Sequence, residues 1–467
     1  MVTRPDRSRL PAPGASRSFS FPPVRKSALS NGMRVWTVRQ AEIPIVAFVL
    51  LVSRGAAADP AGQDGLAATT ADMLDEGSGD RSAIEMHEAI GRLGTQFDTD
   101  IGADAMTVSA TVLSRLADRA LALLGDVVAR PALREADFAR VRDLRLHRLV
   151  QLRDMPAAVA DRAFLKLLYG GDPYGHAPIG SEAALAGLQV GDARGFHARL
   201  IRPSTATLIA VGDCDHDDIA RRAGDAFDGW IGTAEDETPE VGELPAAPHL
   251  AIVPRSGAAQ SELRIGQVSA PRSTPDYHAL VVANTILGGQ FVSRLNINLR
   301  EDKGFTYGAR TAFEFRRRRG PFVLQTAVQT SGTVQAIEES IGEIDGMRGP
   351  RPVSSDELDL AVAALTRGYA RNFETSEQIA RAVLQLALHD LPDDYYAQFV
   401  PTVERITSDD VAQVMARHTD PGTLTTVIVG DPDAIGQELG RLGLGDPVIL
   451  PASPALSTLS TSSPEAF

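Results

Sequence analysis

Apolar residues follow two different spacings in the first part of the chain. Residues 34–55 contain two β-branched apolar runs around a short turn, and residues 95–113 alternate with a period of two about Gly-Ala-Asp. These patterns predict a strand pair and a hairpin. Residues 65–77, 82–94 and 117–131 have helical apolar spacing. Because strands and helices do not strictly alternate, the pattern favours an α+β fold over a doubly wound parallel sheet.

The second part of the chain repeats this pattern. It predicts a strand at 263–269, a helix at 275–288 and a hairpin at 306–328. Residues 192–213 and 410–431 align without a gap, each reading as a helix, a Pro-marked turn, a β-branched strand and a Gly-Asp turn. The identical pairs are Asp192/Asp410, Ala198/Ala416, Arg199/Arg417, Pro203/Pro421, Thr205/Thr423, Val211/Val429, Gly212/Gly430 and Asp213/Asp431. Two repeats are too few for a solenoid, so we infer two homologous domains.

Composition shifts predict where these domains begin and end. The ends, 1–24 and 446–467, are Pro- and Ser-rich without a hydrophobic period, and we expect them to be disordered. Residues 232–248 form an acidic, Pro-rich linker. The predicted domains are therefore 25–231 and 249–445.

Charge and apolar run length exclude several classes of function. The chain has 46 Lys and Arg against 60 Asp and Glu, a net charge of −14, which disfavours nucleic acid as a partner. The longest apolar run, 43–52, is about half a membrane span, so no membrane association is expected. The N-terminus lacks the apolar core of a signal peptide, which predicts a cytoplasmic protein, or a periplasmic one if Met1 is not the natural start. The single cysteine, Cys214, excludes an intramolecular disulfide.

Common catalytic motifs are absent from the sequence. No two of the nine histidines lie within five residues of each other, so neither H-E-x-x-H nor H-x-x-E-H occurs. A phosphate-binding P-loop and a G-x-S-x-G elbow are also missing.

The most informative stretch is residues 286–310, ILGGQFVSRLNINLREDKGFTYGAR. Gly288 and Gly289 end a helix, Arg300 lies in the last turn of the next helix, and Tyr307 follows in a predicted strand. This spacing can bring a guanidinium and a phenol to one side of a cleft, where they could bind a carbonyl and a developing oxyanion. The alternative is an arginine favoured by the helix dipole and a tyrosine packed in the core.

The motif LGGQFVSRLNINLREDKGFTYGA resembles the second-domain signature of the pitrilysin-like metallopeptidases (inverzincins), which include insulin-degrading enzyme and mitochondrial processing peptidase. The resemblance covers roughly residues 26 to 445. It implies two homologous α+β domains, each a mainly antiparallel sheet covered by helices. It also implies that Arg300, with Gly288 and Gly289, binds substrate and that the Tyr307 hydroxyl stabilises the transition state.

The first domain departs from the family at its zinc motif. Where active members have H-x-x-E-H, this chain has Ala68, Ala71 and Asp72, and the glutamate expected about 75 residues later is missing. The resemblance therefore implies no zinc in this chain. A replacement site of Asp72, Asp143 and His147 is an open alternative, although it lacks a general base.

These features predict the non-zinc subunit of a heterodimeric zinc metalloendopeptidase. A homologous partner with an intact H-x-x-E-H would carry the zinc, and Arg300 and Tyr307 would complete its site for an oligopeptide or unfolded segment bound as an added strand. The alternative is a catalytically silent scaffold or peptide-binding protein of the same fold. Arg316 to Arg319, at the tip of the second hairpin, form either a solvated turn or a surface for an acidic partner or peptide.

Overall fold

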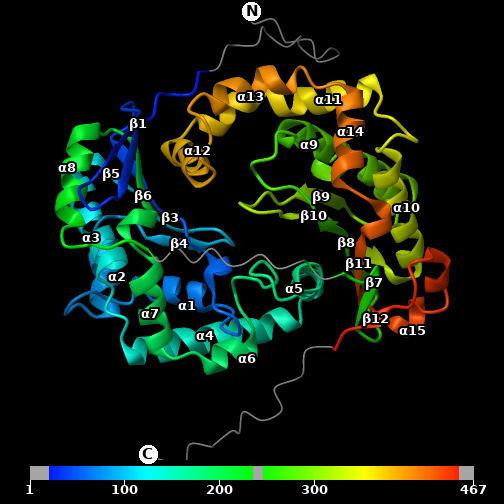
Figure 1. Ribbon diagram of the computed structural model, residues 1–467, viewed down its shortest axis with the longest axis horizontal. Coiled ribbons are helices and arrows are strands. Elements are labelled where there is room, and N and C mark those ends of the chain that lie inside the picture. Colours follow the sequence, from blue (N-terminus) through cyan, green and yellow to red (C-terminus); the bar gives the residue numbers. More distant parts are fainter. Residues whose placement is uncertain (1–19, 235–243, 245, 452–467) are drawn as a thin grey trace, which may run out of the picture.

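The computed structural model describes residues 20–234, 244 and 246–451, and it shows two lobes side by side, each built on one sheet (Figure 1). Within the described residues, no helix is long and apolar enough to cross a membrane. Most of the predicted terminal segments and of the linker lies outside the described residues.

The first lobe contains a six-stranded mixed sheet in the order β1-β2-β6-β3-β5-β4. Only the pair β2 and β6 is parallel. The strands are β1 (Arg25–Ala28), β2 (Arg34–Arg39), β3 (Ile45–Val52), β4 (Asp98–Ile101), β5 (Met106–Leu113) and β6 (Ala206–Gly212). The two strands predicted within 34–55 are thus confirmed as β2 and β3, although β6 lies between them in the sheet. The predicted hairpin is β4 with β5, and the sheet is mainly antiparallel as expected.

The second lobe repeats this sheet in the order β12-β7-β11-β8-β10-β9. The strands are β7 (Leu250–Pro254), β8 (Gln260–Val268), β9 (Ala309–Phe313), β10 (Pro321–Gln329), β11 (Thr425–Gly430) and β12 (Val448–Ile449). Here β7 pairs in parallel with β11 and β12, and the other pairs are antiparallel. Five strands follow the same order in both sheets, and only the edge strands β1 and β12 differ in their place in the chain and in direction. This repeat confirms the prediction of two domains with the same α+β fold.

Helices cover both sheets (Figure 1). The first half contributes α1 (Leu66–Asp72), α2 (Ala83–Gly91), α3 (Ala117–Ala129), α4 (Glu135–Arg153), α5 (Pro156–Tyr169), α6 (Glu182–Gly187), α7 (Val190–Leu200) and α8 (His216–Ala226). The second contributes α9 (Tyr277–Asn284), α10 (Thr333–Gly346), α11 (Ser355–Thr366), α12 (Ser376–Leu388), α13 (Tyr395–Val403), α14 (Ser408–His418) and α15 (Pro432–Ile435). The aligned repeats form α7 with β6 and α14 with β11. Two π-helical segments, η4 (Thr285–Gly289) and η5 (Asn296–Asp302), lie within the signature motif.

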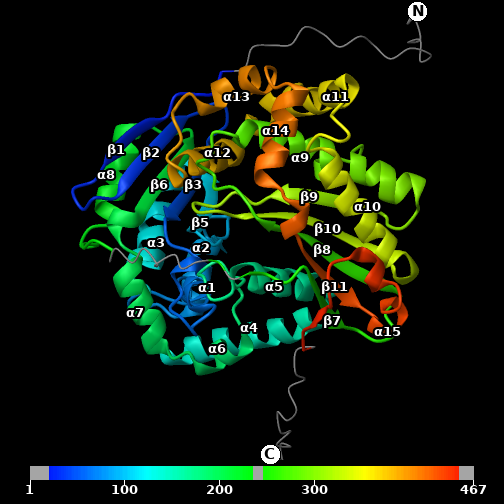
Figure 2. The same cartoon turned by 45° about the vertical axis from the view of Figure 1, so that its right-hand side comes forward.

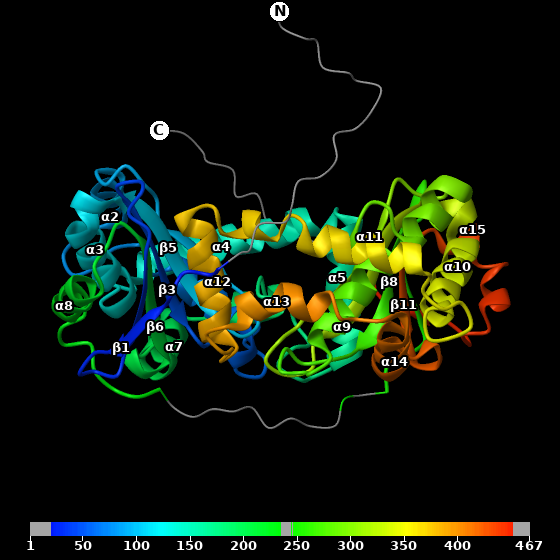
Figure 3. The same ribbon diagram turned by 90° about the horizontal axis from the view of Figure 1, so that it is seen from above.

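In each half of the chain, one helix packs on the sheet of the other lobe. Helix α5 packs on β8 and β11 of the second sheet, and α12 packs on β3 and β6 of the first (Figures 2 and 3). Val49 and Leu51 of β3 therefore share one hydrophobic core with Val383 of α12. Arg264 on β8 binds Asp161 on α5 with an Nε–Oδ1 distance of 2.6 Å. The packing of α5 and α12 on the sheet of the other lobe removes apolar surface from water. It therefore stabilises the contact between the two lobes.

The arginine-rich hairpin tip also joins the two lobes. Arg318 forms a two-pronged ion pair with Asp172 at 3.0 and 3.1 Å, and its backbone N–H donates to the Tyr174 hydroxyl. The backbone N–H of Arg317 donates to Asp104 in the β4–β5 turn. The prediction of a freely solvated turn is therefore wrong for Arg318, which is half-buried against Asp172 and Tyr174, whereas Arg317 and Arg319 are exposed. A role of the cluster in binding an acidic partner or peptide stays a prediction.

The described parts of the terminal segments pack on the second lobe. Phe21 lies against Phe373 and Tyr396, with ring centroids 5.2 and 4.8 Å apart. Val448 and Ile449 add a strand beside β7, so the predicted disordered tail begins with an ordered pair. Backbone pairing with an exposed sheet edge explains this order, which a composition-based prediction does not detect.

Candidate functional site

The two glycines of the signature motif lie where the backbone packs closely, Gly288 against β9 and Gly289 against the end of α9. A Cβ atom on Gly288 would lie 2.8 Å from the backbone nitrogen of Thr311, and one on Gly289 would lie 2.7 Å from the Asn284 side chain. Both contacts are too short for a side chain to fit. Gly288 therefore lets the end of η4 lie against β9, and Gly289 lets the same segment lie against the end of α9.

Asn296 ties the helix that carries Arg300 to the start of β9. Its amide oxygen accepts from the backbone N–H of Ala309 at 2.9 Å, and its amide nitrogen donates to the Ala309 carbonyl at 2.9 Å. The same nitrogen donates to the Gln290 carbonyl. Because this amide is buried and fully used, it fixes the distance in space between the two ends of the motif.

A threonine turn presents Tyr307. The Thr306 hydroxyl accepts from the Gly308 N–H at 3.0 Å, and the Thr326 hydroxyl donates to the Gly308 carbonyl at 3.0 Å. Between these anchors the Tyr307 side chain is 95% exposed. The strand begins at Ala309, so Tyr307 precedes it rather than lying in it. The alternative of a core tyrosine is therefore wrong.

Arg300 lies at the end of η5, as predicted, and is held from two sides. Its guanidinium stacks on the Phe291 ring at 3.6 Å, and its Nε donates to Glu301 at 2.8 Å. Gly288, Gly289, Arg300 and Tyr307 all line one open cleft of about 510 Å³. A guanidinium and a phenol thus line the same cleft, as the spacing of the motif predicts.

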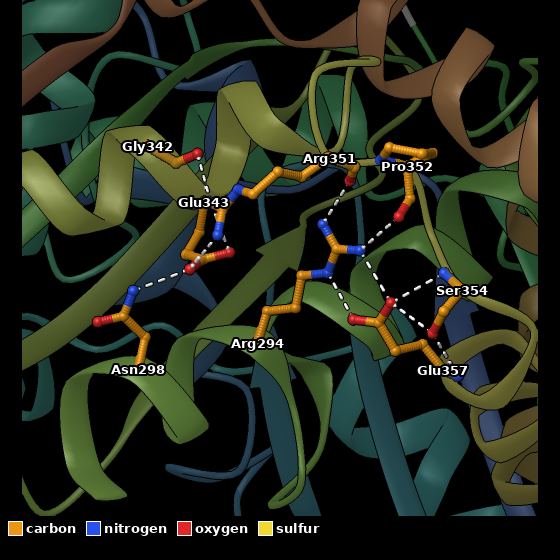
Figure 4. A network of polar contacts seen from close by, with 8 residues as sticks. All are labelled: Arg294, Asn298, Gly342, Glu343, Arg351, Pro352, Ser354 and Glu357. Carbon is orange, nitrogen blue, oxygen red and sulfur yellow. Dashed lines mark hydrogen bonds and ion pairs between the residues drawn. The ribbon is translucent and has the colours of Figure 1, made fainter. Parts of the chain in front are cut away.

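A polar network holds η5 and the turn before it in place (Figure 4). Arg294 donates two hydrogen bonds of 2.6 and 2.9 Å to Glu357. The hydrogen bond from Arg294 is the main reason that the Glu357 pKa is lowered to about 2. Asn298 donates to Glu343, which also pairs with Arg351 at 2.9 Å. Because Glu343 lies on α10 and Glu357 on α11, these contacts fix η5, which carries Arg300, to the helices of the second lobe.

Helix α1, at the position of the family's zinc motif, is packed with small side chains. Ala68 and Ala71 are each 1% exposed. Asp72 accepts a hydrogen bond from Arg145 of α4 at 2.6 Å, and Arg145 also donates to the carbonyls of Pro178 and Ile179 at 3.0 and 3.2 Å. A guanidinium thus neutralises the one carboxylate of the degenerate motif, and methyl groups offer no ligand.

The replacement site of Asp72, Asp143 and His147 is not formed. Arg145 is buried and faces Asp72, while Asp143 and His147 are exposed on the other side of α4. Within the described residues, no group of three His, Cys, Asp or Glu side chains could hold a metal ion. The side chains on α1 and α4 therefore do not fit zinc.

One buried carboxylate anchors α1 without facing a metal. Asp59 accepts from the backbone N–H groups of Gly65 and Ala67 at 2.7 and 2.6 Å. Burial raises the Asp59 pKa to about 6, although these hydrogen bonds and nearby His176 act against the rise.

Sequence reasoning missed Asn296 and Arg145. An asparagine between Leu295 and Leu299, in a helix that buries both leucines, was a detectable signal for a buried amide. Arg145 had no comparable signal, because α4 contains several arginines and only the fold shows which one faces Asp72.

Two duplicated α+β lobes, joined by exchanged helices and carrying a Gly-Gly, Arg and Tyr motif, define a class of two-domain peptidase-like protein. Family models support this class directly. The model described as "Insulinase (Peptidase family M16)" matches residues 34–180, and "Peptidase M16 inactive domain" matches residues 187–365. The chain belongs to this pitrilysin-like family.

Relatives and solved structures agree with that assignment. An uncharacterized zinc protease of Mycobacterium leprae is 24% identical over 399 residues, covering 84% of this chain and 88% of the relative. One from Streptomyces coelicolor is 22% identical over 402 residues, covering 84% and 86%. A peptidase M16 inactive domain from Pseudomonas fluorescens superposes with a TM-score of 0.81 at 23% identity, covering 87% of this chain and 98% of that structure. At this identity the structural match shows the fold alone.

Proposed function

We propose that this chain is the non-zinc subunit of a heterodimeric zinc metalloendopeptidase that cleaves oligopeptides or unfolded segments. The observation that carries this proposal is the cleft in which Arg300 and the exposed Tyr307 lie together. An exposed tyrosine in a fixed turn buries little apolar surface, so folding alone gives no reason to hold it there.

The side chains that line this cleft can donate hydrogen bonds to a peptide carbonyl oxygen. Arg300 offers planar N–H donors to a substrate carbonyl, and the Tyr307 hydroxyl can donate to an oxyanion. Gly288 and Gly289 line the same cleft beside these groups, where an extended peptide could bind. In this proposal the chain supplies binding and oxyanion donors, while its described residues contain no group of side chains that could hold a metal ion.

A homologous partner with an intact H-x-x-E-H would supply the missing parts, since a zinc ion activates water as a nucleophile. Phe291, Val292 and Ile297 are exposed apolar side chains on the same motif as Tyr307. We expect this apolar surface to face the partner and the bound peptide. A cytoplasmic location stays a prediction.

Affinity purification of this chain from its source, with identification of co-eluting proteins, tests the proposal. We expect a stoichiometric homologue of similar size with intact H-x-x-E-H, and peptide hydrolysis only when both chains are mixed. Recovery of this chain without such a homologue would contradict the proposal and favour the silent scaffold or peptide-binding role.

A further inference from the structure

A second cavity, of about 410 Å³, lies in the second lobe among α9, α12, α13 and the short 3-10 helix Tyr369–Phe373. It shares no lining residue with the cleft of Arg300 and Tyr307. Its walls are mostly aromatic. The rings are those of Tyr277, Tyr369, Tyr395, Tyr396, Phe373 and Phe399.

The charge of this cavity is opposite to that of the chain. Arg272 and Arg381 line it, and no Asp or Glu does, although the whole chain carries a net charge of −14. The remaining polar groups on its walls are the side-chain amides of Asn372, Gln378 and Gln385. A positive, amide-bearing aromatic cavity favours an anionic ligand with flat groups.

Arg272 is the central feature of the cavity. It is 8% exposed, and its guanidinium stacks 3.5 Å from the Tyr277 ring centroid and 5.0 Å from that of Tyr395. In the part of the chain that the structure describes, this guanidinium has no carboxylate partner. Stacking stabilises the cation but leaves the in-plane N–H donors unused. Since buried charges are normally paired, the geometry calls for an acceptor from outside the described residues.

Groups near Arg272 do not supply a negative charge to pair with it. The pKa of His278 is lowered by burial and by the charge of Arg272, and burial together with the same charge lowers the pKa of His389 to about 4. Burial and the charge of Arg272 thus disfavour the protonated form of both histidines, and neither adds a negative charge beside Arg272. Asp104 and Asp390 influence His389, but neither lines the cavity. Asp104 already accepts hydrogen bonds from Tyr174 and from the backbone of Arg317.

The rings at the edge of the cavity already hold an aromatic side chain. Phe21 packs edge-on against Phe373 and tilted against Tyr396. An aromatic or large apolar side chain is thus compatible with this surface, because ring pairs at these spacings attract each other.

We propose that this cavity binds the C-terminal residue of a peptide. The terminal carboxylate would bind Arg272, with Arg381 adding charge from the rim, and the terminal side chain would lie among the tyrosines. Gln385 and Asn372 would bind the last peptide bond, since side-chain amides both donate and accept. This amide chemistry is the reason to favour a peptide over a simple aromatic acid.

Calorimetric titration of the full chain with N-acetyl-Gly-Phe tests the proposal, with the C-terminal carboxamide of the same dipeptide and 3-phenylpropionate as comparisons. We expect binding of the acid and at least tenfold weaker binding of the carboxamide, because the carboxamide cannot form the charge-assisted pair. Equal binding of acid and carboxamide, or no binding of the acid, would overturn the proposal. Binding of 3-phenylpropionate as tight as that of the peptide would replace the peptide with a small carboxylate.

Variants locate the site. We expect Arg272→Gln to abolish binding of the peptide acid and Arg381→Gln to weaken that binding a few-fold. The control is Arg371→Gln, since Arg371 is exposed and does not line the cavity, and it should change the binding less than twofold. If Arg272→Gln does not fold, Arg381→Gln and the carboxamide comparison decide. The measurement needs no zinc-bearing partner and no residue of the Arg300 cleft, so its failure would leave the proposed function standing.

Discussion

Helix α1 of the first lobe and the motif of residues 286–310 in the second have opposite surface chemistry. In α1, Ala68 and Ala71 are buried, and the buried hydroxyls of Thr69 and Thr70 bond to carbonyls of their own turn. In the motif, Tyr307 is exposed and Arg300 opens on a cleft.

The difference shows which of the two regions packing alone explains. Packing accounts for α1, because small apolar side chains suit a helix interface. Holding an exposed phenol in a turn fixed by Thr306, Thr326 and Asn296 gives no comparable stability. Each prediction below tests this contrast.

The largest effect is expected from Tyr307→Phe in the complex with a zinc-bearing partner. Loss of one oxyanion donor lowers turnover by about 10²-fold or more. Steady-state kinetics on a peptide substrate, with unchanged thermal unfolding, measures it. Arg441→Gln, a surface arginine paired with Glu438, is the control and should leave turnover unaltered. Normal turnover in Tyr307→Phe would remove this residue from the mechanism.

Asn296→Ala should destabilise the fold by about 1–3 kcal/mol, because the Ala309 N–H and carbonyl lose their buried partner. Thr70→Val on α1 is the comparison. Its hydroxyl only adds to a helix carbonyl, so we expect a cost below about 1 kcal/mol. Urea unfolding of both variants checks the difference, and equal costs would contradict the role of Asn296 as the anchor of the motif.

Arg145→Met should cost about 1–3 kcal/mol, since the carbonyls of Pro178 and Ile179 lose a buried donor. Asp72→Asn should cost less, because Asp72 is 44% exposed and water can replace the carboxylate contact. Neither variant should bind zinc, which equilibrium dialysis can test. A larger cost for Asp72→Asn would mean that the carboxylate, not the arginine, organises this region.

The smallest effect is a pH dependence centred on Glu357. Its pKa falls from an ordinary 4.5 to about 2 in the folded chain, mainly through the hydrogen bond from Arg294. A lowered folded pKa stabilises the fold above about pH 4.5, and this contribution is lost as the pH falls toward 2. Unfolding free energies of wild type and Glu357→Gln should therefore converge on acidification. A gap independent of pH would exclude this ion pair as its source.

Much of the fold was accessible from local sequence patterns. The strand pair at 34–55, the hairpins at 95–113 and 306–328, and the repeat of helix and strand are local features with strong periodicity. The motif also placed Gly288, Gly289, Arg300 and Tyr307 on one cleft. It did not reveal Asn296 as their anchor, because a hydrogen bond to Ala309 depends on how the helix meets the strand.

The sequence by itself determined the α+β class and the duplication, since these follow from residue type and spacing. That Ala68, Ala71 and Asp72 stand where the family has its zinc motif follows from the resemblance to that family. Tertiary structure alone decided that α5 and α12 exchange between lobes, that Arg318 meets Asp172, and that Arg145 faces Asp72. These contacts join residues far apart in the chain. Their partners are selected by the packing of whole faces, which no local pattern encodes.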